Sequence, residues 1–192
     1  NNNILMCPRC KAALPSPEHC SHCDATFASD NGTPVLVTDG ATTSMTVELT
    51  QGYYQHDLDR LQALLKLPVT QRSRSSKLPY HMQAGQAAML EKLPAGSTVL
   101  EIGCGGGQNR AYVKSLGLEY VGTDISKTRV FDWLQEFGGP DVVCDAHFLP
   151  FKDQSIDAVY CTAVFEHLAS PNLAASEVAR VLKPGGVFLG NV

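Results

Sequence analysis

The chain has 192 residues, of which 44% are hydrophobic and 18% are charged. This composition suits one ordinary domain with a small appendage, and it excludes a mostly disordered protein. The net charge of −4 argues against a protein that coats nucleic acid or anionic membranes through bulk charge. The sequence has no apolar stretch of membrane-spanning length and no secretory signal, so we expect a cytoplasmic protein.

Four of the seven cysteines form two Cys-x-x-Cys pairs near the N-terminus, at Cys7, Cys10, Cys20 and Cys23. Each pair places two thiolates on a tight turn, and two such turns complete a tetrahedral zinc site. His19 or His22 could replace one cysteine, although we favour four thiolates. Residues 1–40 have too little apolar sequence for a core of their own, and residues 35–37 are expected to form a strand. We therefore predict a structural zinc ribbon over residues 1–40.

Helical patterns follow at residues 46–67 and 80–93, and each is ended by a proline. The basic stretch at residues 71–77 between them is interpreted as a solvated linker. We assign residues 41–79 to a helical linker or lid.

From residue 98 onward, apolar strands alternate with helices. Strands are expected at residues 98–102, 119–123, 141–144, 158–162 and 187–192, and helices at 109–116, 128–137 and 170–182. This alternation is typical of an α/β fold with a doubly wound, mostly parallel Rossmann-like sheet covered on both faces. Ligands of such sheets bind at the carboxyl ends of the strands.

Residues 101–107 read Glu-Ile-Gly-Cys-Gly-Gly-Gly and connect the first of these strands to a helix. Glycines let the backbone turn sharply and approach a ligand closely. The pattern is not the Gly-x-Gly-x-x-Gly of nicotinamide-binding proteins, because Gln108 occupies the third glycine position, and no Walker-type lysine follows. Glu101 beside the loop would repel a pyrophosphate but suits a ligand that carries an ammonium and a sulfonium.

Acidic residues end the next two strands. Asp124 is placed to accept hydrogen bonds from both hydroxyls of a ribose. Asp145, together with a backbone N–H, could recognise the donor and acceptor of an adenine edge. Cys104 and Cys144 are interpreted as small core residues.

Residues 80–192 resemble a class I S-adenosylmethionine-dependent methyltransferase of the small-molecule type. The resemblance is carried by five blocks in order: the glycine loop, Asp124, Asp145-Ala146 with Leu149-Pro150-Phe151, Phe165-Glu166-His167-Leu168, and the stretch from Glu177 to Gly186. It implies a methyltransferase with S-adenosylmethionine as cofactor and a small molecule as acceptor.

The resemblance also implies roles for single residues. Gly103, Gly105 and Gly107 would border the methionine part of the cofactor, with Glu101 near its ammonium. Asp124 would hold the ribose and Ile125 would pack on the adenine, whose edge Asp145 and Ala146 would recognise. Cys161 and Thr162 would lie under the sulfonium.

Glu166 and His167 are the titratable pair expected near the methyl group. A general base is needed only when the acceptor must lose a proton, so both are weak catalytic candidates. Some relatives bind a divalent metal through Glu-x-x-Glu-His, but Ala163 occupies the first glutamate position here.

Two other functions stay open. Residues 1–40 resemble the zinc-ribbon module that precedes the catalytic domain of large-subunit rRNA guanine-N1 methyltransferases, which would make RNA a partner. A non-catalytic module that binds the cofactor and a partner is the other alternative. Methyltransferases of this fold normally have seven strands, and the sequence ends within the fifth, so we expect a truncated chain without strands 6 and 7. Such a fragment would keep the cofactor side and lack much of the acceptor side.

Overall fold

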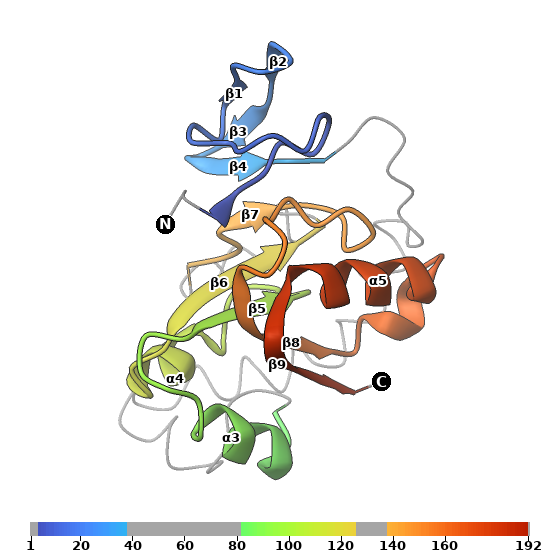
Figure 1. Ribbon diagram of the computed structural model, residues 1–192. Coiled ribbons are helices and arrows are strands. Elements are labelled where there is room, and N and C mark those ends of the chain that lie inside the picture. The colour runs from blue at the N-terminus through green and yellow to red at the C-terminus, as the bar shows by residue number, and fades with distance from the viewer. Residues whose placement is uncertain (1–3, 38–81, 126–137, 192) are drawn as a thin grey trace, which may run out of the picture.

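The computed structural model describes residues 4–37, 82–125 and 138–191 (Figure 1). The predicted helices at 46–67 and 128–137 and the basic stretch at 71–77 lie outside these residues. Among the described residues, no helix has both the length and the apolar character needed to cross a membrane.

A seven-stranded sheet forms the centre of the molecule, in the order β3-β4-β7-β6-β5-β8-β9. All neighbours pair in parallel except β3 and β4. The strands are β3 (Ala28–Asp30), β4 (Thr33–Val35), β5 (Thr98–Ile102), β6 (Glu119–Asp124), β7 (Val142–Val143), β8 (Ile156–Thr162) and β9 (Leu182–Asn191). The predicted parallel α/β sheet is confirmed.

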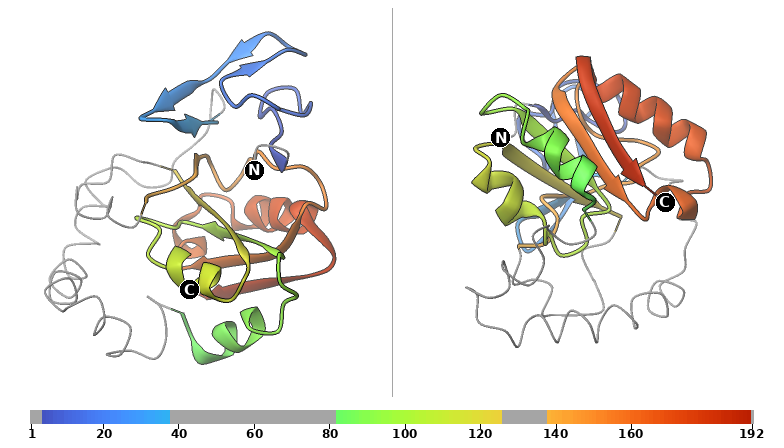
Figure 2. Two further views of the ribbon diagram at one scale, coloured as in Figure 1. Left: turned by 90° about the vertical axis from the view of Figure 1, so that its left-hand side faces the viewer. Right: turned by 90° about the horizontal axis from the view of Figure 1, so that it is seen from below.

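Helices cover both faces of this sheet (Figure 2). Val99 and Leu100 are neighbours in β5 but belong to different buried clusters, because successive strand residues face opposite sides. The cluster of Val99 includes residues of α3 (Ala84–Leu90) and α4 (Arg110–Ser115), and the cluster of Leu100 includes residues of α5 (Pro171–Val181). Three of the predicted helices are therefore confirmed, although α3 is shorter than the predicted 80–93.

The N-terminal cysteine ribbon, which we define as residues 4–37, is continuous with the main sheet (Figure 1). It contains a hairpin of β1 (His19–Cys20) and β2 (Ala25–Thr26), followed by the hairpin of β3 and β4. The expected strand near residue 35 is present, but it does more than close the ribbon. Val35 pairs in parallel with Val143, and the N–H of Leu36 donates to the Val143 carbonyl at 2.8 Å.

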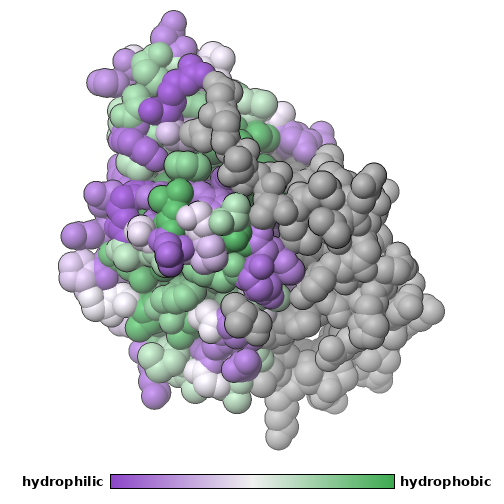
Figure 3. All heavy atoms as spheres, turned by 90° about the vertical axis from the view of Figure 1, so that its right-hand side faces the viewer, coloured by the Kyte–Doolittle hydropathy of each residue, from purple (hydrophilic) through white to green (hydrophobic). Residues whose placement is uncertain are grey.

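The ribbon also shares its core with the sheet. Leu5, Leu14 and Leu36 are buried in the same cluster as Leu149 and Phe151. Packing on the larger domain therefore supplies the apolar contacts that so short a segment lacks by itself. On the face shown in Figure 3, hydrophilic and hydrophobic residues are mixed over the ribbon.

The last strand differs from the prediction. Pro184-Gly185-Gly186 was expected to separate the helix from a strand at 187–192, but β9 begins at Leu182, directly after α5. The pairing shifts between Ile156–Leu182 and Ala158–Val187, so the Pro-Gly-Gly segment is absorbed as an irregularity within the strand. A Cβ atom on Gly186 would lie 3.0 Å from the Asp157 carbonyl oxygen, which explains glycine at this position.

Candidate functional site

The carboxyl ends of β5, β6, β7 and β8 lie at one edge of the sheet, as their parallel pairing requires. This edge brings together the glycine loop after β5, Asp124 at the end of β6, and Asp145 two residues after β7. It is the position at which open parallel sheets bind their ligands.

The glycine loop is held by backbone hydrogen bonds to the neighbouring strand. The N–H groups of Gly103 and Cys104 both donate to the Thr123 carbonyl, at 2.8 and 2.9 Å. Gly103 has a φ of +72°, and a Cβ atom there would overlap the Val164 side chain. Glycine is therefore required both by the backbone conformation and by the close approach of the loop after β8.

Asp124 connects the end of β6 to this loop. Its side chain is buried, and its Oδ2 accepts a hydrogen bond from the Gly105 N–H at 3.0 Å. The next residue, Ile125, is 40% exposed although it is large and apolar. An acidic group and an exposed apolar side chain thus follow one another at the sheet edge. Their roles at a nucleoside stay a prediction.

The Asp145 carboxylate is buried, and its two oxygens differ in their surroundings. Its Oδ1 accepts hydrogen bonds from the His147 N–H at 2.9 Å and lies 2.6 Å from His147 Nδ1. Its Oδ2 is buried and has no hydrogen-bond partner among the described residues. Buried carboxylate oxygens are normally hydrogen-bonded, so Oδ2 has an unused acceptor position. Ala146, the other predicted adenine contact, is buried beside it.

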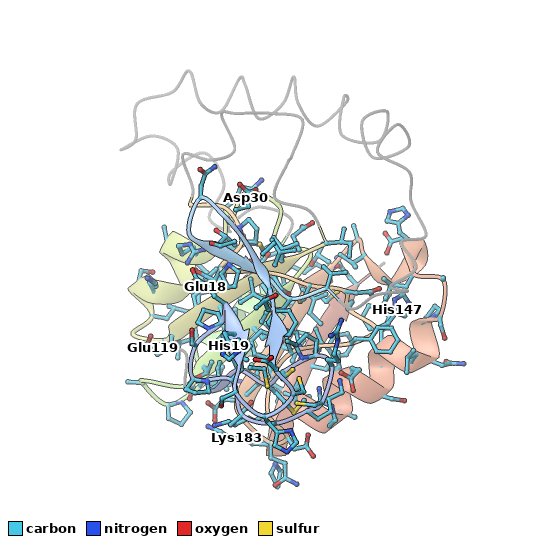
Figure 4. All side chains as sticks on the ribbon, turned by 90° about the horizontal axis from the view of Figure 1, so that it is seen from above. Glu18, His19, Asp30, Glu119, His147 and Lys183 are labelled. Carbon is cyan, nitrogen blue, oxygen red and sulfur yellow. The ribbon has the colours of Figure 1, made fainter. Side chains whose placement is uncertain are left out.

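His147 fixes this carboxylate and was missed by the sequence analysis. The N–H of Ser170 donates to His147 Nε2 at 3.1 Å, so Nε2 is an acceptor and the ring proton lies on Nδ1, facing Asp145. The imidazole thereby joins the loop after β7 to the N-terminus of α5. In Figure 4, His147 lies on the α5 side of the molecule, opposite Glu119 at the start of β6. The Asp-x-His spacing is the signal that could have revealed this contact.

Glu101 lies beneath the glycine loop with both carboxylate oxygens in use. Oε1 accepts from Asn109 Nδ2 at 2.7 Å, and Oε2 accepts from the Tyr120 hydroxyl at 2.6 Å. Burial raises the pKa of Glu101 to about 7, although these two hydrogen bonds lower it. The resemblance places this carboxylate near the ligand's ammonium, whereas its partners Asn109 and Tyr120 carry no signal in the sequence. In the structure, Glu101 of β5 bonds to the N-cap residue of α4 and to β6.

The segment after β8 carries the remaining predicted residues. Cys161 is buried against the core and pairs with Ile102 of β5, and Thr162 ends the strand. Ala163 has a left-handed φ of +52°, which turns the chain into the short helix η3 (Phe165–His167). The structure brings Glu166 Oε1 and His167 Nε2 to 3.9 Å from one another. Their catalytic role stays a prediction.

The four ribbon cysteines converge on one point. Their sulfur atoms all lie within 4.8 Å of one another. Cys7 Sγ is 3.7 Å from Cys23 Sγ, and Cys10 Sγ is 3.6 Å from Cys20 Sγ. Disulfide sulfurs would be about 2 Å apart, whereas four thiolates around one zinc ion at about 2.3 Å lie about 3.8 Å apart. The sulfur positions therefore fit a tetrahedral metal ion.

The pKa values of the thiols shift in opposite directions within the cluster. Hydrogen bonding from the Cys23 backbone N–H lowers the pKa of Cys20 to about 6, whereas burial raises the pKa values of Cys7 and Cys23. A metal ion binds deprotonated thiolates, so metal binding would release protons from the cluster.

Comparison with known proteins agrees with this architecture. Residues 100–190 match a family model described as "Methyltransferase domain". The match covers the sheet from β5 to β9 and every predicted cofactor residue. This part of the chain is similar to a methyltransferase domain.

The curated relatives of this chain differ in what their names say they act on. The chain is 36% identical over 128 residues to 2-methyl-6-phytyl-1,4-hydroquinone methyltransferase of Synechocystis, a match that covers 64% of this chain and 40% of the relative. It is 39% identical over 110 residues to the tRNA (carboxymethyluridine(34)-5-O)-methyltransferase of Arabidopsis thaliana, covering 54% and 26%. The chain thus spans less than half the length of these relatives.

Among solved structures, the YcgJ protein of Bacillus subtilis matches with a TM-score of 0.45 and 32% identity, over 56% of this chain and 50% of that one.

The methyltransferase-like domain should lose stability as pH rises because of Glu101. Both folded and unfolded chains bind the proton below pH 4.5, the ordinary pKa of this group, and neither binds it well above pH 7. Between these values only the folded chain holds it, so stability falls with increasing pH. Glu101→Gln removes this effect. We expect denaturant unfolding to show the variant gaining roughly 3 kcal/mol on the wild type between pH 4.5 and pH 8. A constant difference across that range would contradict the assignment.

Proposed function

We propose that the chain binds S-adenosylmethionine at the carboxyl edge of its sheet and transfers the methyl group to a small-molecule acceptor. The observation that carries the proposal is the buried, unpartnered Oδ2 of Asp145, beside a glycine loop and Asp124 in a methyltransferase-like domain. A donor on the ligand would complete the hydrogen bonding of this carboxylate.

The described residues suit the three parts of this cofactor. An adenine amine would donate to Asp145 Oδ2, with the Ala146 backbone at the ring edge and the exposed Ile125 on the ring face. Asp124 would accept the ribose hydroxyls. Gly103, Gly105 and Gly107 would border the methionine part, where the backbone can approach closely.

Methyl transfer needs little further chemistry from the chain. The bound cofactor supplies an activated methyl group on a sulfonium. Cys161 and Thr162 would lie under that sulfonium, and the turn at Ala163 would direct the following segment toward the acceptor. Alignment of the acceptor with the methyl group provides most of the acceleration. Glu166 or His167 would serve as a base only for an acceptor that must lose a proton.

Cofactor binding is tested with Asp145→Asn. The amide keeps the size of the side chain but removes the charge. Its oxygen stays with the two His147 donors, so the NH₂ group faces the adenine amine and cannot accept its hydrogen bond. Since hydrogen bonds to charged groups contribute about 1.5–3 kcal/mol, we expect affinity for S-adenosylhomocysteine to fall at least about tenfold in calorimetry. Asp30→Asn, the same change at the end of β3, should bind like the wild type. Equal affinity of Asp145→Asn and the wild type would refute the adenine assignment.

The acceptor is proposed to be a small molecule because the ribbon lacks the basic surface that binding to RNA phosphates requires. Residues 4–37 contain two basic and three acidic side chains. An rRNA base is the second candidate, carried by the ribbon's resemblance to the module of rRNA methyltransferases.

Labelled S-adenosylmethionine separates these candidates. We expect label to pass from it to compounds in a small-molecule panel that includes hydroquinones, and not to ribosomal or transfer RNA. Labelling confined to RNA would overturn the small-molecule proposal. Cofactor binding without transfer to either class by the full-length protein would favour the non-catalytic alternative.

We further propose that the four cysteines hold one structural zinc ion. Four protein ligands leave no open position for a substrate, which fits a structural site. Elemental analysis should find one zinc per chain, and Cys10→Ser should lower the content substantially. Cys104→Ala, at a buried cysteine outside the ribbon, should retain the full content. Iron in place of zinc, or equal zinc in both variants, would contradict this assignment.

A further inference from the structure

The segment from Val143 to Lys152 is bound at both ends by the cysteine ribbon. At its start, the Leu36 N–H donates to the Val143 carbonyl at 2.8 Å. At its end, the Met6 N–H donates to the Pro150 carbonyl, and the Lys152 N–H donates to the Ile4 carbonyl, both at 2.9 Å. Figure 1 shows the ribbon directly above β7 and the loop that follows it. Two separate parts of the ribbon therefore fix the two ends of one loop.

The ribbon's hydrogen bonds to this segment lie next to the cysteine cluster. Cys7 directly follows the residues that bond to Pro150 and Lys152, and its N–H and carbonyl form the turn to Ala12 and Lys11, at 2.7 and 2.9 Å. The sulfur of Cys7 lies in the four-cysteine cluster. Cys7 and Cys20 are also fully buried in the core cluster that contains Leu149 and Phe151. Two of the cysteines and two residues of the loop thus pack in one buried cluster.

Between the two ends of this segment lies Asp145, whose Oδ2 is buried and unpartnered. The loop has other anchors on the α5 side. Arg180 donates to the carbonyls of Leu149 and Phe151, at 2.8 and 2.7 Å, and His147 accepts from Ser170. The ribbon supplies anchors on the other side. At the β7 end it acts together with β6, because the Cys144 N–H donates to the Asp124 carbonyl at 2.9 Å.

We propose that the cysteine ribbon acts as an internal support for the adenine-binding loop. Metal binding at the four cysteines and cofactor binding at Asp145 then strengthen one another, although neither ligand touches the other. The coupling is reciprocal, because both ligands favour the same arrangement of residues 143–152. This inference rests on the proposed function, and it gives the ribbon a task at the cofactor site rather than at an acceptor.

Zinc removal with a chelator tests the coupling on the whole chain. Loss of zinc should increase amide hydrogen exchange in residues 143–152 and weaken S-adenosylhomocysteine binding by about fivefold or more in calorimetry. Exchange in α4, which has no contact with the ribbon among the described hydrogen bonds, should stay the same. Re-addition of zinc should restore both properties.

Two matched variants repeat the test without a chelator. Cys10→Ser removes a metal ligand, whereas Ser29→Ala changes an exposed residue of the same ribbon that has no part in the cysteine cluster. We expect the first to reproduce the effects of zinc removal and the second to behave like the wild type.

The outcomes separate this inference from the proposed function. If the zinc-loaded wild type does not bind S-adenosylhomocysteine, the proposed function fails. If it binds, but affinity and loop exchange do not change when zinc leaves, the coupling is refuted. Increased exchange spread equally over α4 and β5 would also refute it, because that result indicates a general loss of stability.

Discussion

The candidate site is built around a buried carboxylate that the protein satisfies on one side only. Burying an ionised group is costly unless its oxygens are hydrogen-bonded. In Asp145, Oδ1 has partners from His147, while Oδ2 has none among the described residues. The imidazole is held in turn by Ser170 at the entry to α5. The chain thus fixes the direction in which a ligand's donor must approach, before any ligand is bound.

This arrangement needs a rigid loop after β7, and the topology provides one. β7 has only two residues, yet it lies between β6 and β4 in the sheet. The cysteine ribbon and α5 hold the loop from opposite sides, by backbone bonds and by Arg180. The sequence suggests a separate appendage, but the ribbon contributes β3 and β4, the outer strands of the same sheet. The two parts share one sheet and one buried cluster, so their stabilities are linked.

Local patterns were enough to predict the parallel sheet, the glycine loop and the convergence of Asp124 and Asp145 at one edge. They also predicted the cysteine cluster, because Cys-x-x-Cys spacing fixes its geometry locally. The pairing of Val35 with Val143 was not predictable, since it joins residues more than a hundred positions apart without a charge or spacing signal. The partners of Glu101 were not predictable either, because Asn109 and Tyr120 come within hydrogen-bond distance of it only through the packing of α4 and β6 on β5.

The central claim is that Asp145 Oδ2 receives its missing hydrogen bond from the adenine of the cofactor. A crystal structure of the zinc-loaded chain with S-adenosylhomocysteine tests it most directly. The account predicts the adenine amine within about 3 Å of Asp145 Oδ2, with the ring against Ile125. A nucleoside bound elsewhere, or one whose amine faces away from Asp145 while Oδ2 pairs with another group, would contradict it.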